Sequence, residues 1–308
     1  MSASAVNGAS AACASREGPP PGTPTASAVL DQAAKENFPV ASRLLPRAER
    51  DHLMALYGFA RMVDDIGDEA DGDRAALLDW VAGELDLVYL GSPAAQPTHA
   101  LMRTLADSVR ALDLPRDPFE RLIEANRREQ EVRRIASYEE LIESCRLSAM
   151  PVGELVLHVF GAATPERVAL SDDVCAGLQL VEHLQDVRED RLRGHVYLPQ
   201  ADMRRCGAVL SDLDAERPST SLRAVLMIET RRARQLLAAG IPLIRSLAPR
   251  PGFAVAAFVA GGRAALDAIE NAGYDVLGRQ PRPSNVGLAR AFGRTLRQAG
   301  SPTDWGTP

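Results

Sequence analysis

The sequence predicts an all-α protein, most simply a single helical domain. Apolar residues recur at helical spacing along most of the chain, as they do between Leu77 and Val88. No segment shows the apolar–polar alternation of a half-buried strand. The 308 residues are 46% hydrophobic, which is enough to bury a sizeable core. We therefore expect one helical domain over residues 27–300.

The expected elements follow one another from the N-terminus. Residues 1–26 are mostly Ala, Ser, Gly and Pro, and we expect them to be disordered because they can bury little apolar surface. A short helix begins near Ser27, and Pro46 suits the first turn of a long helix. Residues 301–308 should be frayed. The next helix, which carries Leu77 to Val88, is expected to end at Gly91. The others are expected to cover 97–112, 117–134, 138–161 with a kink or division at Pro151, 171–193, 199–206, 219–247 with an interruption near Pro242, 251–277 and 283–299.

The composition excludes several classes of protein. A formal net charge of −6 argues against nucleic acid as the main partner. The four cysteines form no CxxC pair and no zinc-type cluster with histidine, so we expect reduced thiols in a cytoplasmic protein. The sequence contains no run of 18 apolar residues, so we expect no transmembrane helix. The N-terminus lacks the features of a signal peptide.

One helical stretch, from Tyr57 to Glu69, combines an apolar face with a charged face. At about 100° per residue, the side chains of Tyr57, Arg61, Asp64 and Asp68 fall within roughly 60° of each other. Carboxylates four residues apart on one face can share Mg²⁺ with a phosphate. A solvated acidic face is the alternative. Asp65 and Glu69 are rotated away and are expected to be supporting or solvated. The opposite face should be buried: Phe59, Met62, Val63 and Ile66.

A second acidic stripe lies on the helix expected at 171–193. Around Asp186, the same wheel brings together Gln179, Glu182, Glu189, Asp190 and Arg193, with His183 at the edge. Two such stripes facing each other across a cavity could hold two or three Mg²⁺ ions and neutralise a diphosphate. The structural alternative is that each stripe is solvated and pairs with nearby arginines. The residues expected outside the stripe, toward the core, are Leu180, Val181, Leu184 and Leu192.

The order and spacing of these motifs resemble the squalene/phytoene synthase family. The resemblance rests on Asp64-x-x-x-Asp68 after Tyr57 and Arg61, on Gln185-Asp186-x-x-x-Asp190, and on Tyr197. The stretches ENFPVAS, LLPR, CRLSAMPVG, HLQDVREDRLRGHVYLP and YDVL resemble its hydroxysqualene synthase branch, which serves bacterial hopanoid biosynthesis. The resemblance implies an α-helical isoprenoid synthase fold with a central apolar cavity. It also implies a lyase-type reaction, in which Mg²⁺-assisted ionisation of presqualene diphosphate gives a cyclopropylcarbinyl cation that rearranges and captures water to form hydroxysqualene.

The resemblance also implies roles for individual residues. Asp64, Asp68, Asp186 and Asp190 match catalytic metal-binding positions, with Glu182 as a further oxygen ligand, and Tyr197 matches a catalytic position in the substrate site. Substrate contacts are implied for Ser42, Tyr57, Arg61, Gln185 and Arg193, and the helix around Val152 and Gly153 would line the hydrocarbon tunnel. The sequence departs from the family at three positions: Glu182 and Met150 replace a frequent Asn, and His195 replaces a basic residue.

Several alternatives stay open at this stage. The chain could be a head-to-head prenyl synthase making presqualene diphosphate, squalene or phytoene. It could also be an inactive scaffold partner of a sister synthase. The small Gly153 fits close helix packing as well as a ligand cavity. The basic segment with Arg279, Arg282, Arg290, Arg294 and Arg297 could lie on an anionic membrane surface or be a solvated helix.

Overall fold

The protein is helical throughout the part of the chain that the computed structural model describes, residues 18–32, 45–278, 280–302 and 305–306. In these residues the β-type pairing is limited to an isolated bridge between Arg134 and Val196. The expected all-α class is therefore confirmed. The elements are α1 (Ala26–Gln32), α2 (Arg47–Asp68), α3 (Arg74–Leu90), α4 (Ala100–Leu112), α5 (Asp117–Glu131), α6 (Tyr138–Ser148), α7 (Met150–Val159), α8 (Pro165–Gln185), α9 (Val187–Leu192), α10 (Gln200–Cys206), the 3₁₀ helix η2 (Leu210–Asp214), α11 (Thr220–Ala239), α12 (Ile241–Ser246), α13 (Pro249–Asn271) and α14 (Asn285–Ala299).

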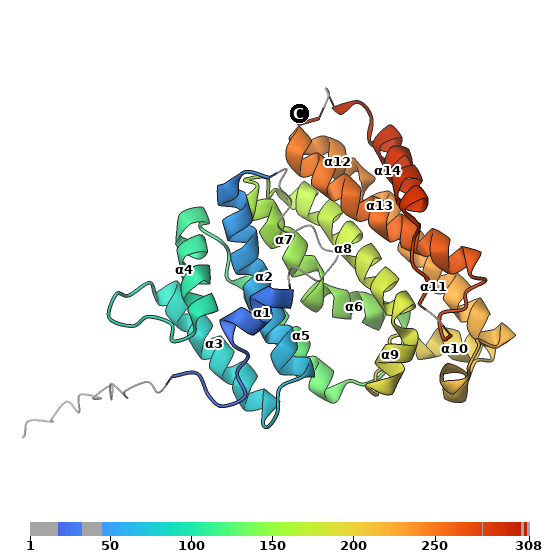
Figure 1. Ribbon diagram of the computed structural model, residues 1–308, viewed down its shortest axis with the longest axis horizontal. Coiled ribbons are helices and arrows are strands. Elements are labelled where there is room, and N and C mark those ends of the chain that lie inside the picture. The colour runs from blue at the N-terminus through green and yellow to red at the C-terminus, as the bar shows by residue number, and fades with distance from the viewer. Residues whose placement is uncertain (1–17, 33–44, 279, 303–304, 307–308) are drawn as a thin grey trace, which may run out of the picture.

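The helices enclose two large hydrophobic clusters, besides a small one of alanines between α13 and α14. The first contains the apolar faces of α2, α3, α4 and α5, and the second contains those of α8, α11, α12 and α13. Helix α7 contributes to both, with Leu155 and Val159 in the first cluster and Leu157 in the second. Figure 1 shows α8 and α9 between the N-terminal helices and the C-terminal helices α11–α14. The two acidic stripes thus come from different clusters, α2 from the first and α8–α9 from the second.

Helix ends follow the expected local signals. The Asp73 side chain caps α3 by accepting a 3.0 Å hydrogen bond from the Ala76 backbone N–H, and Gly91 ends the helix in the left-handed region at φ 61°. The stretch 138–161 is divided at Ala149, so that Pro151 lies in the first turn of α7. Pro242 likewise lies in the first turn of α12. Both interruptions were expected, because proline lacks the N–H that a helix interior requires.

The helix expected over 171–193 is in fact two helices. Asp186 has φ −105° and ψ 13°, which ends α8 and starts the six-residue α9. The wheel drawn for an unbroken helix therefore misplaces Leu192. Leu192, expected to face the core, is 79% exposed, whereas Leu180, Val181 and Leu184 are buried as expected.

Helix α13 is a core helix of the described structure. By length and composition alone it is apolar enough to cross a membrane, and no other helix among the described residues meets that test. However, 61% of its apolar window is buried in the protein, where it packs against α8, α11, α12 and α14. Composition is weak evidence for a span when the helix is packed in this way.

Both ends of the described chain contact the domain. Near the N-terminus, His99 Nε2 lies 3.1 Å from the Pro24 carbonyl oxygen, so contacts begin before residue 27. At the other end, Trp305 is 5% exposed and its ring lies 5.0 Å from that of Phe253. The segment expected to fray therefore includes an anchored tryptophan.

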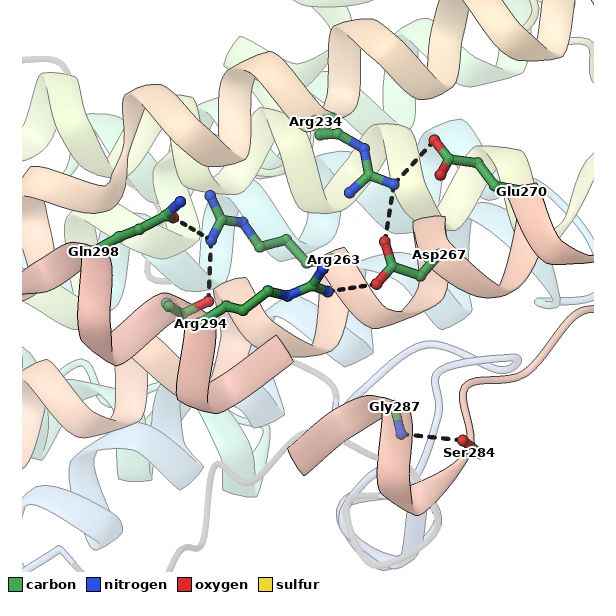
Figure 2. Close-up of polar contacts among 9 residues, drawn as sticks. Arg234, Arg263, Asp267, Glu270, Ser284, Gly287, Arg294 and Gln298 are labelled. Atoms are coloured by element: carbon green, nitrogen blue, oxygen red, sulfur yellow. Dashed lines mark hydrogen bonds and ion pairs between the residues drawn. The ribbon is translucent and has the colours of Figure 1, made fainter. Parts of the chain in front are cut away.

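Helix α14 is attached to α13 by polar contacts at several points (Figure 2). The buried Arg263 donates to Gln298 at 2.7 Å and to Thr295 at 3.2 Å. Arg294 pairs with Asp267, which also accepts from Arg234 of α11. These contacts hold one side of α14 and leave its first turn exposed.

Candidate active site

The charged stripe of α2 forms as the sequence predicts. Phe59, Met62, Val63 and Ile66 are 0% exposed, whereas Asp64 and Asp68 are accessible on the other face. Asp64 is accessible to solvent, yet protein surrounds its carboxyl, and this burial raises the pKa of the carboxyl to about 7. The negative charges of Asp68 and Glu129 contribute to the same rise. These properties indicate that Asp64 faces a recess rather than open solvent.

Asp65 supports this stripe from inside the protein. Its carboxylate is 2.8 Å from Arg61 Nε, one helical turn away, and the residue is only 6% exposed. The ion pair fixes the direction of the guanidinium along α2. Asp65 was expected to be supporting or solvated, and the structure shows the supporting role.

Asn126 of α5 holds the Asp64 carboxylate. Its Nδ2 donates to Asp64 Oδ1 at 3.1 Å, and Asn126 is itself buried. This approach requires Gly67 on α2, because a Cβ at that position would lie 2.0 Å from Asn126 Oδ1. The Gly67 carbonyl also accepts bonds from Arg74 and Gln130. The glycine in the DDIGDE stretch therefore allows α5 to reach the first acidic pair.

The second acidic stripe survives the break at Asp186. The Asp186 N–H donates to the Glu182 carbonyl at 2.9 Å, and the Asp190 N–H donates to the Asp186 carbonyl at 2.8 Å. Because both bonds span four residues, the three side chains still lie on successive turns. Burial raises the pKa of Asp190 to about 7, and the nearby charges of Asp186 and Glu182 raise it further.

Tyr197 lies between the two stripes. Its hydroxyl donates to Glu129 Oε1 of α5 at 2.9 Å. Burial raises the pKa of the phenol, followed by the effects of Glu129, and the charges of Asp190 and Asp68 raise it as well. Electrostatic effects on a pKa weaken with distance, so a phenol whose pKa is raised by both Asp68 and Asp190 lies near both carboxylates. The acidic residues of α2 and of α8–α9 therefore both lie near this phenol, as a shared site would require.

Backbone pairing holds the loop that carries Tyr197. Ile135 donates to the Val196 carbonyl at 3.2 Å, and Val196 donates to the Arg133 carbonyl at 2.9 Å. These bonds tie residues 133–136, after α5, to the loop after α9. They fix Tyr197 opposite α5, next to Glu129.

Two histidines flank the Tyr197 ring. His183 of α8 stacks on it at 3.9 Å with 14° between the ring planes, and burial lowers the pKa of His183 to about 3. His195 lies at 5.8 Å on a nearly parallel plane. Its Nε2 contacts Arg133, and burial, followed by Arg133, lowers its pKa. At the position where the family often has a basic residue, this chain thus has a histidine beside an arginine.

The carboxylates suit Mg²⁺ by their chemistry. They supply hard oxygen ligands in pairs on two helices. A divalent cation would favour the charged carboxylates of Asp64 and Asp190, whose pKa values are raised by burial first and by neighbouring carboxylates second. Among the described residues, no three His, Cys, Asp or Glu side chains are close enough together to hold an ion unaided. Mg²⁺ commonly uses one or two carboxylates together with substrate phosphates, so the donor set fits a metal–diphosphate complex.

Comparison with known proteins identifies the family. The profile of the squalene/phytoene synthase family matches residues 32–287. The chain belongs to this family. It is 39% identical to a hydroxysqualene synthase of Rhodopseudomonas palustris over 213 residues, which cover 68% of this chain and 70% of the relative. It is 32% identical to a phytoene synthase of Mycobacterium tuberculosis over 233 residues, covering 74% of this chain and 75% of the relative.

Solved structures agree with the family assignment. A squalene synthase, HpnC, from Alicyclobacillus acidocaldarius superimposes with a TM-score of 0.75 at 40% identity, covering 80% of this chain and 92% of the other. A dehydrosqualene synthase superimposes with a TM-score of 0.77 at 20% identity, covering 88% and 94%, and this likeness supports the fold alone. The all-α isoprenoid synthase fold is thus confirmed, and the protein is a prenyl synthase of isoprenoid biosynthesis.

Some residues implied by the family resemblance have other partners in the structure. Gln185 donates to the Pro281 carbonyl at 3.1 Å, and Arg193, which is exposed, lies 3.4 Å from Glu189. Gly153 lies at the α7–α8 contact, where a Cβ would be 2.4 Å from Ser171 Oγ, so close packing explains it. Tyr57 and Val152 are half-buried against the first cluster, and Ser42 lies outside the described residues.

Four residues that contact the candidate site were missed by sequence reasoning: Asn126, Glu129, His183 as a stacking partner, and Gln280. Asn126 carried a usable signal, since it follows Leu122 by four residues on the apolar face of α5. Gln280 carried none, because it reaches Asp186 across 94 positions of sequence.

Proposed function

We propose that this protein converts presqualene diphosphate and water to hydroxysqualene and diphosphate in a Mg²⁺-dependent reaction. The observation that carries the proposal is the position of Tyr197: its hydroxyl donates to Glu129 at 2.9 Å, and the charges of both Asp68 and Asp190 raise its pKa, which supports a site shared by the two acidic pairs. Three relatives named hydroxysqualene synthase, 34–39% identical to this chain, support the choice of product.

The reaction needs charge neutralisation and no redox partner. The carbon–oxygen bond to the diphosphate breaks, the carbocation rearranges, and water adds with loss of one proton to solvent. Mg²⁺, when bound, would offset the charge of the departing diphosphate. Asp64 and Asp68 would hold it on one side and Asp186 and Asp190 on the other, with Glu182 as a further oxygen ligand.

The other side chains would position these groups. Arg61, fixed by Asp65, would meet the phosphate oxygens with the neighbouring Tyr57. Asn126 would keep one oxygen of Asp64 engaged and the other available. Tyr197, bonded to Glu129, would separate the two acidic pairs and close the site on the side of the His183 ring.

A product assay tests the proposal. Purified protein is incubated with presqualene diphosphate and Mg²⁺ without NADPH, and the products are identified by mass spectrometry. Hydroxysqualene is expected. Squalene that forms only after NADPH is added would overturn the assignment, because squalene formation requires a hydride donor.

Substitutions test whether the two acidic pairs act together. Asp64→Ala and Asp186→Ala should each abolish turnover, a loss of at least ~10²-fold. Asp107→Ala is the matched control, because Asp107 is exposed on α4 and forms an ion pair with Arg110 on the same helix. Turnover that survives both site substitutions would contradict the shared metal site.

A second candidate is head-to-head condensation by the same site. A presqualene diphosphate synthase of Rhodopseudomonas palustris is 30% identical over 197 residues, and the phytoene synthase noted above is 32% identical. Farnesyl and geranylgeranyl diphosphates, offered in parallel assays, would reveal this activity. A wild-type protein inactive with every one of these diphosphates would instead favour a scaffold partner of a sister synthase.

A further inference from the structure

A segment after α13 lies against the junction of α8 and α9. We call residues 276–278 and 280–282 the strap. Val276, Leu277 and Pro281 are buried. Arg188 of α9 donates to the Leu277 carbonyl at 3.2 Å, and Gln185 of α8 donates to the Pro281 carbonyl at 3.1 Å. The strap is therefore attached to both sides of the break at Asp186.

From this strap, the side chain of Gln280 reaches the acidic site. Its amide Nε2 donates a hydrogen bond to Asp186 Oδ1. Gln280 is half-buried, and its amide oxygen faces Arg282 at 3.4 Å. Asp186 terminates α8 outside regular helix geometry, so the helix backbone alone does not fix its side chain as firmly as a mid-helix position would.

We propose that Gln280 is a positioning residue for the second metal-binding pair, and this inference rests on the function proposed above. The amide occupies Oδ1 of Asp186 and directs Oδ2 toward the cation of a metal–diphosphate complex. Hydrogen-bond partners of metal ligands commonly act in this way, and their loss weakens metal binding by roughly 10- to 100-fold. A neutral amide supplies the bond without cancelling the charge that the cation requires.

The contacts separate this role from simple attachment of the strap. Arg188 and Gln185 hold the strap through backbone carbonyls, independently of the Gln280 side chain. Gln280→Met keeps the side-chain length and removes the donor. Arg188→Met removes a strap attachment and leaves Gln280 in place, so it serves as the matched control.

The experiment measures binding of Mg²⁺ in the presence of inorganic pyrophosphate to the full chain, by calorimetry and by the rise in melting temperature. Gln280→Met should weaken Mg²⁺ binding roughly 10- to 100-fold. It should lower the melting temperature of the unliganded protein by only about 2–4 °C, as expected for the loss of one hydrogen bond. In turnover assays the Mg²⁺ concentration for half-maximal rate should rise correspondingly. Arg188→Met should lower the melting temperature and change Mg²⁺ binding by less than about threefold.

Three results would overturn the inference. The first is wild-type Mg²⁺ binding by Gln280→Met, and the second is an equal loss in Arg188→Met, which would indicate strap attachment alone. A wild type that binds no Mg²⁺ with pyrophosphate would overturn it as well. Failure of the proposed function is seen separately, in the product assay. A wild type that binds the metal and pyrophosphate but forms no hydroxysqualene leaves the role of Gln280 intact.

Discussion

The hydroxyl of Tyr197 donates a 2.9 Å hydrogen bond to the carboxylate of Glu129, and this bond joins the loop after α9 to α5. Burial raises the pKa of Glu129, while the bond from Tyr197 lowers it. The phenol thus stabilises the charged form of a carboxylate that Asp68 would otherwise repel. The pair fixes the relative placement of the two acidic stripes.

Tyr197→Phe should therefore reduce turnover by about tenfold or more, since it frees Glu129 and loosens the loop between the stripes. It should also cost about 1 kcal/mol in the free energy of unfolding, the usual value of one hydrogen bond. Turnover and urea denaturation measure the two effects. Tyr89→Phe is the control, because the Tyr89 hydroxyl donates a comparable 3.0 Å bond to the Leu114 carbonyl away from the site. Equal turnover losses in both variants would show that the effect is general destabilisation.

Gly67→Ala should disturb both stability and the first acidic pair. The added Cβ would lie 2.0 Å from Asn126 Oδ1, so α5 or the Asn126 side chain must move, at a cost of roughly 1–3 kcal/mol. Displacing Asn126 also removes its bond to Asp64, and turnover should fall. Gly83→Ala provides the control, because among the described residues nothing apart from its own stretch of helix lies within 4 Å of a Cβ added at that helical glycine. It should stabilise the protein by about 0.5–1 kcal/mol, and destabilisation there would contradict the packing argument.

The sequence predicted what depends on local periodicity. The wheel for α2 separated Asp64 from the buried Met62 correctly, because that helix is regular throughout. The same reasoning failed for Leu192, because Asp186 breaks the helix without any proline or glycine to signal it. Contacts between distant segments carry no periodic signal, so Gln280 on Asp186 could only be found in three dimensions.

His183 should make stability depend on pH. Burial lowers its pKa from 6.5 to about 3, so between these values the unfolded chain binds a proton that the folded protein does not. The stability contributed by neutral His183 is thus fully present above pH 6.5 and is lost as the pH falls toward 3. His183→Phe keeps a ring against Tyr197 and removes the titration. Urea denaturation at pH 5 and pH 7.5 should show a smaller difference for His183→Phe than for the wild type; equal differences would contradict the assignment.

We expect the exposed end of α14 to contact an anionic membrane surface, since the proposed substrate is a long hydrocarbon and the protein is expected to be cytoplasmic. Val286 and Leu288 are 59% and 36% exposed there, near the exposed Arg290. The helix contains arginines and no acidic residue, in a chain with net charge −6. Apolar side chains beside basic ones are typical of helices that lie in a lipid interface.

Point substitutions test this surface better than truncation, because removing residues 280–308 would also remove the Gln280 and Trp305 contacts. Val286→Ser combined with Leu288→Ser should weaken co-sedimentation with anionic vesicles about 30-fold, as expected from losing roughly 1 kcal/mol of apolar burial at each of the two positions. Val209→Ser, at a position that is 58% exposed elsewhere, is the control. Binding should fall with added salt and be weak on neutral vesicles. If the double variant binds like the wild type, α14 is a solvated helix.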